Sequence, residues 1–103
     1  MTGRRRLPAR RSAETFEIEC SGLRFTITAG RYPDGSLDEV FITNHKAGST
    51  AGIMASDSAI VASLCLQWGI PLDLLRKSLS RDAHGHASGV LGRALDRLAG
   101  DES

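Results

Sequence analysis

The stretch Ile42–Gly52, which reads ITNHKAGSTAG, places a lysine, a glycine and two hydroxyl side chains after a predicted strand. A helix starting here would present free backbone N–H groups and the positive end of its dipole, and Lys46 would add charge. The spacing differs from a Walker A motif, because one glycine precedes the hydroxyls and Lys46 precedes Gly48. Gly48 can also simply turn the chain while Ser49 or Thr50 caps the helix. We favour this cap over an anion- or nucleotide-binding site made of Lys46, Gly48, Ser49 and Thr50.

A second cluster of possible ligands is the segment DAHGH, with Asp82, His84 and His86. Two histidines on a loop can bind zinc or nickel, but a firm site needs a third and usually a fourth ligand. Asp82 or His45 would supply one only if the fold brought it close. We therefore interpret His84 and His86 as solvated loop residues, and we expect neither a metal nor a cofactor.

The two cysteines, Cys20 and Cys65, are far apart and form neither a disulfide framework nor a Cys-x-x-Cys motif. Both lie in apolar surroundings, where cysteine usually acts as a small buried hydrophobic residue. No base stands in an obvious position to activate either thiol. These observations favour a reduced, cytoplasmic protein that is not an enzyme.

The charge distribution is uneven, although the net charge is only +1. Five arginines and no acidic residue fall within residues 1–11, and these are Arg4, Arg5, Arg6, Arg10 and Arg11. Such an arm can bind nucleic acid or an acidic partner, or it can lie in solvent or across the acidic surface of its own domain. We divide the chain into a basic arm (1–12), a single domain (13–99) and an acidic tail (100–103).

The first half of the domain shows the alternation typical of strands. Apolar and polar residues alternate over 15–20 and 23–29, with the turn residues Ser21 and Gly22 between them. A turn at 32–35 leads to a third, more continuously apolar run over 39–43. This pattern predicts a three-stranded antiparallel meander.

The second half predicts two or three helices that pack on one face of the sheet, which makes an α+β domain. The first helix should run from the hydroxyls at 49–50 to Trp68, with Gly69 and Pro71 ending it. A shorter helix should follow Pro71, and a last one should follow Gly89. No segment approaches the roughly 18 consecutive apolar residues of a membrane span, so we expect no membrane.

The long helix has two apolar faces of different size. Its large residues form a stripe of the kind that a surface helix turns toward its core, namely Ile53, Ile60, Val61, Leu64 and Trp68. A second face is small and permits the close approach of another element, with Gly52, Ala55, Ser56, Ala59, Ala62 and Ser63. We expect a homodimer in which this helix or an edge strand forms the contact, with Met54, Leu66 and Trp68 as apolar area.

Four motifs in order resemble one known domain. They are RRRLP at 4–8, YPDGSLDEVFI at 32–42, KAGST at 46–50 and SLCLQWGIPLDLL at 63–75. Together they resemble the TSCPD domain, the C-terminal accessory domain of adenosylcobalamin-dependent ribonucleotide reductases, which also occurs as small stand-alone proteins. The resemblance covers roughly residues 4–80. It implies this α+β fold and an association with a ribonucleotide reductase or another larger protein.

The chain also departs from that domain. The Thr-Ser-Cys-Pro-Asp signature would fall near residues 85–89, which contain no cysteine, and the barrel and redox cysteines of the reductases have no counterpart. Ribonucleoside-diphosphate reduction would be the activity implied by family resemblance alone. We therefore expect a stand-alone, non-catalytic module for assembly or binding. Nucleic-acid binding by the arm, or regulation by an anion or nucleotide at the Lys46–Thr50 loop, is the alternative.

Overall fold

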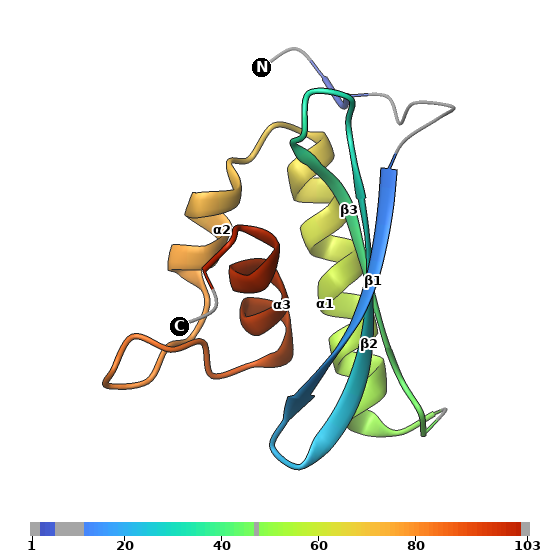
Figure 1. The fold of residues 1–103 in the computed structure, drawn as a ribbon, viewed down its shortest axis with the longest axis vertical. Coiled ribbons are helices and arrows are strands. Elements are labelled where there is room, and N and C mark those ends of the chain that lie inside the picture. The colour runs from blue at the N-terminus through green and yellow to red at the C-terminus, as the bar shows by residue number, and fades with distance from the viewer. Residues whose placement is uncertain (1–2, 6–11, 47, 102–103) are drawn as a thin grey trace.

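The computed structural model describes residues 3–5, 12–46 and 48–101. Three antiparallel strands form one sheet in the order β1-β2-β3, with β1 at Ser12–Cys20, β2 at Leu23–Arg31 and β3 at Leu37–Asn44. Three helices follow, α1 at Thr50–Gln67, α2 at Leu72–Ser78 and α3 at Val90–Leu98. All three lie on the same side of the sheet (Figure 1). The predicted α+β fold and the meander are therefore confirmed.

The first hairpin turns where the sequence indicates. Ser21 and Gly22 have φ angles of 55° and 78°, and two successive positive φ values are typical of the two-residue turns that match strand twist. The strands are longer than the alternation suggested, since β1 begins at Ser12, inside the range that we assigned to the arm. The register between β2 and β3 shifts at Gly30 and Arg31.

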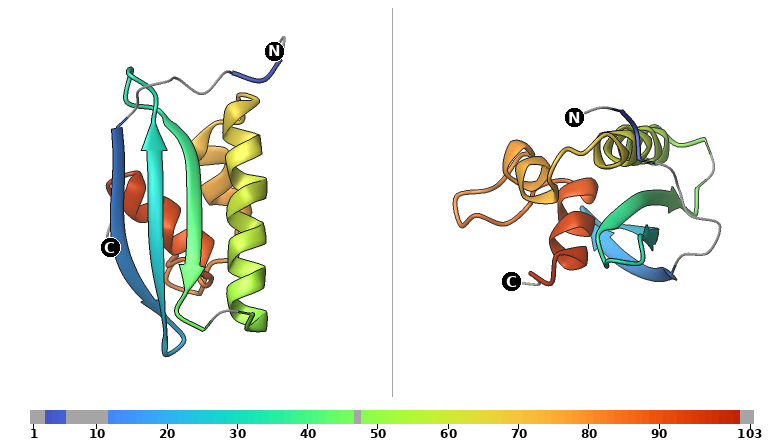
Figure 2. Two further views of the ribbon diagram at one scale, coloured as in Figure 1. Left: turned by 90° about the vertical axis from the view of Figure 1, so that its right-hand side faces the viewer. Right: turned by 90° about the horizontal axis from the view of Figure 1, so that it is seen from above.

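α1 runs back along β3, at the side of the sheet away from β1 (Figure 2). The helix begins at an N-cap, Ser49, whose hydroxyl accepts a hydrogen bond from the Gly52 N–H at 3.1 Å. It buries its small face against the sheet, with Ala55, Ala59, Ala62, Ser63, Leu66 and Gln67. The element that the small residues admit is therefore β3 of the same chain.

Two polar residues of this small face bond to the backbone of β3. The Ser63 hydroxyl accepts a hydrogen bond from the Val40 N–H at 2.8 Å and lies 3.0 Å from the Val40 carbonyl oxygen. The Gln67 amide donates to the carbonyl of Asp38 at 3.1 Å. Since β3 is an edge strand, these contacts satisfy backbone groups that a further strand would otherwise bond.

The large apolar face of α1 points away from the domain, which corrects the interpretation of the stripe as a core face. Its residues are 43–60% exposed, and they are Ile53, Ile60, Val61, Leu64 and Trp68. The contact that we expected from the small residues is also corrected, because Ala59, Ser63 and Leu66 are buried inside the domain. Large side chains between α1 and β3 would hold the helix too far away for Ser63 to bond to Val40.

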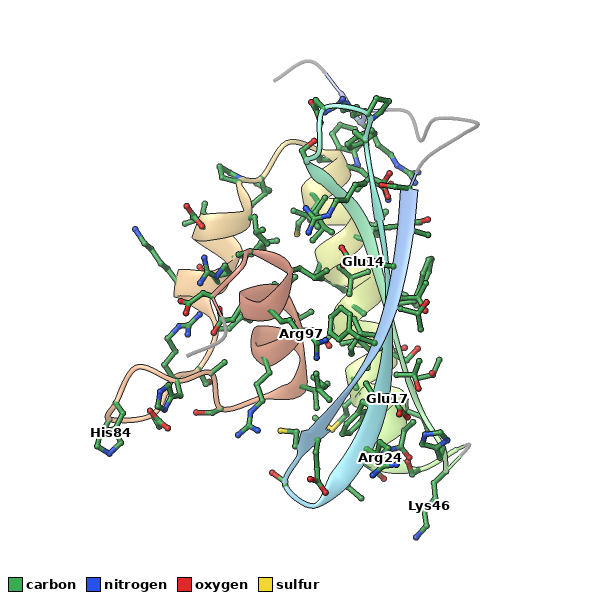
Figure 3. All side chains as sticks on the ribbon, in the orientation of Figure 1. Glu14, Glu17, Arg24, Lys46, His84 and Arg97 are labelled. Carbon is green, nitrogen blue, oxygen red and sulfur yellow. The ribbon has the colours of Figure 1, made fainter. Side chains whose placement is uncertain are left out.

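α3 closes the other half of the core, beside β1 and β2. Ala94, Leu95 and Leu98 are buried, and they join the inward residues of β2 and β3. On its exposed side Arg97 places its guanidinium 4.2 Å from the ring centre of Phe16 on β1 (Figure 3). The apolar residues at helical spacing in α3 therefore face the core, as the sequence pattern predicted.

Replacing Ser63 by alanine should lower the free energy of unfolding by about 1–3 kcal/mol. The buried Val40 N–H would lose its partner, and a buried donor without an acceptor costs about that much. Urea denaturation at equilibrium measures the change. Ser58→Ala is the matched control, because the Ser58 hydroxyl bonds only to Ala55 within the same helix and is part-buried. Equal stability of both variants would show that the Ser63 contact does not hold α1 to β3.

Candidate functional site

The Lys46–Thr50 loop is organised around the start of α1. The Asn44 side chain accepts a hydrogen bond from the Lys46 N–H at 2.9 Å, and Gly48 has a φ of 78°. A Cβ atom at Gly52 would lie 2.9 Å from the Ser49 hydroxyl oxygen, so the cap needs a residue without a side chain there. The hydroxyl of Ser49 is thus occupied by the helix. Binding of an anion or nucleotide by this loop stays a prediction.

A shallow hollow of about 340 Å³ lies beside this loop, between β3 and the first turns of α1. Lys46 and Gly48 line it, but so does Asp57. Asp57 is exposed on α1, and its negative charge opposes the binding of a phosphate or carboxylate at the same place. The electrostatics of the hollow therefore do not favour an anion.

Two arginines of the predicted arm are held by the domain. The Arg5 N–H donates to the Gln67 carbonyl, and the Arg4 guanidinium donates to the Gln67 side chain at 2.5 Å. The Arg5 guanidinium lies 3.5 Å from the ring centre of Tyr32 and 3.2 Å from a carboxylate oxygen of Asp34. These cations also stand at the C-terminal end of α1, where the helix dipole favours positive charge.

The contacts of Arg4 and Arg5 with the domain agree with the alternative that the arm lies across its own domain. Arg6, Arg10 and Arg11 lie outside the described residues. Nucleic-acid binding by the arm stays a prediction. Arg4 and Arg5, which contact the domain, do not support it.

His84 and His86 lie on the exposed loop before α3, with ring centres 6.3 Å apart. His84 lies on the opposite side of the molecule from Lys46 in the view of Figure 3. Asp82 accepts the backbone N–H groups of both histidines, and these bonds hold the pKa of Asp82 below its usual range. Among the described residues no group of three or more His, Cys, Asp or Glu side chains could hold a metal ion.

The two thiols do not meet. Cys20 is buried, with its sulfur 3.8 Å from the Ser88 carbonyl oxygen, and Cys65 is partly buried on α1. His45 is bonded instead to Glu17 at 3.4 Å, on the exposed side of β1 and β3. Among the described residues, no thiol forms a hydrogen bond with a histidine.

An ion-pair cluster that the sequence did not indicate joins α2, the following loop and α3. The Arg81 guanidinium donates a hydrogen bond to each carboxylate oxygen of Asp96, both at 2.8 Å. The Arg76 guanidinium donates to the same carboxylate at 2.9 Å. Arg76 also reaches Asp73 and Asp101. The hydrogen bonds from Arg81, and then those from Arg76, lower the pKa of Asp96 to about 2, against the opposing effect of its partial burial.

Replacing Asp96 by asparagine should lower the free energy of unfolding at neutral pH by about 1.5–3 kcal/mol, the usual value of hydrogen bonds to a charged group. The pKa of Asp96 is lower in the folded state than in the unfolded state, so the carboxylate stabilises the fold above pH 4. This stabilisation is lost as the pH falls from about 4 to about 2, and the two proteins should become equally stable there.

Urea denaturation at a series of pH values measures this difference. Asp73→Asn is the matched control, because Asp73 is 77% exposed and touches only one arginine of the cluster. We expect it to change little at any pH. A difference between Asp96→Asn and the native protein that stays constant down to pH 2 would contradict the assignment.

The most unusual surface of the domain is the outward face of α1, which we call the α1 face. It comprises Ile53, Met54, Asp57, Ile60, Val61, Leu64 and Trp68. The six apolar members are between 43% and 67% exposed. A helix that is apolar on all sides is ordinarily buried on all sides. Exposed apolar patches of this kind mark interaction sites. At one end the α1 face borders the hollow beside the Lys46–Thr50 loop, which Ile53 and Asp57 also line.

α1 is also the one described helix whose length and composition would allow it to cross a membrane, with a mean hydropathy of 1.2 over 18 residues. Our expectation that no segment comes near this limit was therefore too strong. Composition alone is weak evidence, because helices that pack on a sheet pass the same test. The hydrogen bonds of Ser63 and Gln67 place α1 among these packed helices.

The structure is a small α+β module with one exposed apolar helix face. The chain is similar to vitamin B12-dependent ribonucleotide reductases. It is 38% identical over 73 residues to the reductase of Bradyrhizobium diazoefficiens, and the aligned residues make up 71% of this chain and 6% of the reductase. It is 34% identical over 88 residues to the reductase of Rhodopirellula baltica, and the alignment covers 82% of this chain and 8% of the reductase. It is 40% identical over 70 residues to the reductase of Streptantibioticus cattleyicolor, and the alignment covers 68% of this chain and 12% of the reductase.

The chain thus spans about a tenth or less of the length of most of these relatives, and it is homologous to one segment of them. No protein-family model matches the chain. No solved structure matches it either. The resemblance to reductases noted in the sequence is supported at this level, as similarity to a part of those enzymes.

Proposed function

We propose that this chain is a non-catalytic module of the TSCPD type, which acts by protein contact in association with a ribonucleotide reductase. The observation that carries the proposal is the α1 face, since it is apolar, exposed and built on a helix that the domain holds rigidly through Ser63. The similarity to a segment of B12-dependent reductases supports the choice of partner. The setting that we propose is cytoplasmic.

The side chains that could do chemistry are used for structure or stand apart. Ser49 caps α1, Asp82 holds the loop before α3, and Asp96 is shared by two arginines. These roles support a domain whose polar groups stabilise its own fold. They do not support a nucleophile with its base.

The relatives are named for vitamin B12, and the described residues do not fit that group. A hollow with a volume of about 810 Å³ is lined by Arg5, Arg31 and Arg76. Each of these arginines is already paired with a carboxylate of this chain. This hollow therefore does not fit the corrin ring of cobalamin, and we assign no cobalamin chemistry to it.

Purified protein should not reduce ribonucleotides, even with adenosylcobalamin and a dithiol present. The physical reason is that no base among the described residues forms a hydrogen bond with Cys20 or Cys65. The assay follows deoxyribonucleotide formation, with an intact B12-dependent reductase as the positive control. Turnover above a protein-free blank, abolished in a folded Cys20→Ala, Cys65→Ala double variant, would contradict the non-catalytic role.

The protein should bind the B12-dependent reductase of the same cell. Biolayer interferometry with tagged chain and purified reductase measures the affinity, which we expect in the micromolar range typical of transient contacts. Untagged chain must compete for the same sites, which separates specific binding from adsorption. Absence of binding at high micromolar reductase would overturn the proposed partner.

A further inference from the structure

The outward residues of α1 have a symmetry that points to what covers them. Six of the seven members of the α1 face, all except Met54, are spaced by four, three, one, three and four residues, at Ile53, Asp57, Ile60, Val61, Leu64 and Trp68. This series reads the same in both directions about the midpoint between Ile60 and Val61. A two-fold axis through that point would place Ile53 of one helix opposite Trp68 of an identical, antiparallel helix.

We infer that the α1 face is where a second copy of this chain binds, with the two α1 helices antiparallel about a two-fold axis at Ile60 and Val61. A two-fold contact uses the same patch on both copies, so the patch must be complementary to itself. The palindromic spacing provides this complementarity. The inference rests on the same surface as the proposed function, so the second copy and the reductase are alternative occupants of the α1 face.

The exposed area agrees with such a contact. A large apolar side chain that is about half exposed offers on the order of 100 Å², so the six together offer roughly 600 Å². A stable interface takes roughly 800 Å² from each partner, including a polar rim. The α1 face therefore supplies most of what a symmetric dimer needs, and neighbouring residues of the loop before α1 and of β3 can supply the rim.

The single charge of the face is compatible with this arrangement. Asp57 lies three to four residues from the axis, so the two copies of Asp57 are separated by roughly 10 Å along the helices, at 1.5 Å per residue. Each carboxylate stands opposite Leu64 of the other helix, away from the axis. Two carboxylates at the axis itself would repel each other at close range.

A membrane is a poorer fit to the same face. Helices that lie on membranes usually border their apolar side with lysine and arginine, whereas Asp57 is the single charged residue of α1. A carboxylate in the middle of the apolar side would be drawn into the lipid.

Sedimentation equilibrium of the full chain at high micromolar concentration tests the inference. We expect a mass twice the 11.0 kDa of one chain. Val61→Lys should weaken association at least about 100-fold, because it brings two like charges together at the axis. Leu74→Lys is the matched control: Leu74 is 53% exposed on α2, outside the α1 face, and this variant should stay dimeric. Circular dichroism checks that both variants are folded.

The orientation is tested by disulfide formation in a Cys65→Ser background. Val61→Cys lies at the axis, so two copies should cross-link under mild oxidation, whereas two Ile53→Cys positions would be roughly 22 Å apart along the helices, at 1.5 Å per residue. That distance is too long for a disulfide. Cross-linking of both variants would indicate parallel helices and overturn the antiparallel pairing.

A native chain that stays monomeric at every concentration would overturn the inference. Sedimentation with vesicles of anionic lipid then shows whether a membrane covers the face instead. A monomer that binds the reductase would overturn the dimer alone, and a dimer that binds no reductase would overturn the proposed partner alone.

Discussion

Val40 and Asp38 turn backbone groups toward the outer edge of β3, where the sheet ends. Buried backbone groups need partners, and here Ser63 and Gln67 of α1 provide them. Bonds of about 3 Å from short side chains hold the helix close to the strand. The residues between helix and strand must then be small, as Ala55, Ala59 and Ala62 are. The edge of β3 therefore decides which face of α1 is buried.

The same constraint leaves the large residues of α1 outside. It also distinguishes the two uncovered surfaces of the domain. The outer face of the sheet is mainly polar and bonds within itself, as Thr15 lies 3.4 Å from Thr28 and His45 reaches Glu17. Antiparallel sheets commonly leave one such face in water. The α1 face has no comparable polar partners, so it is the surface that gains most from being covered.

Much of the fold could be predicted from local patterns. The alternation in the strands, the Ser21–Gly22 turn and the spacing in α3 all depend on neighbours in sequence, and the structure follows them. The buried face of α1 could not be predicted, because both of its faces are apolar and size usually favours the larger one. Ser63 and Gln67 were the available signal, since polar residues on a small face need buried partners. The pairing of Arg76 and Arg81 with Asp96 depends on contacts between distant elements.

The relatives suggest how the α1 face can be covered in more than one setting. The matched segment makes up 6–12% of those reductases, so most of their chain lies outside the segment that resembles this protein. In the present chain the described residues leave the α1 face exposed. A self-complementary face is covered by an identical copy without any further sequence. The palindromic spacing about Ile60 and Val61 is therefore a stronger argument for the second copy than apolar area alone, because area would suit any apolar surface.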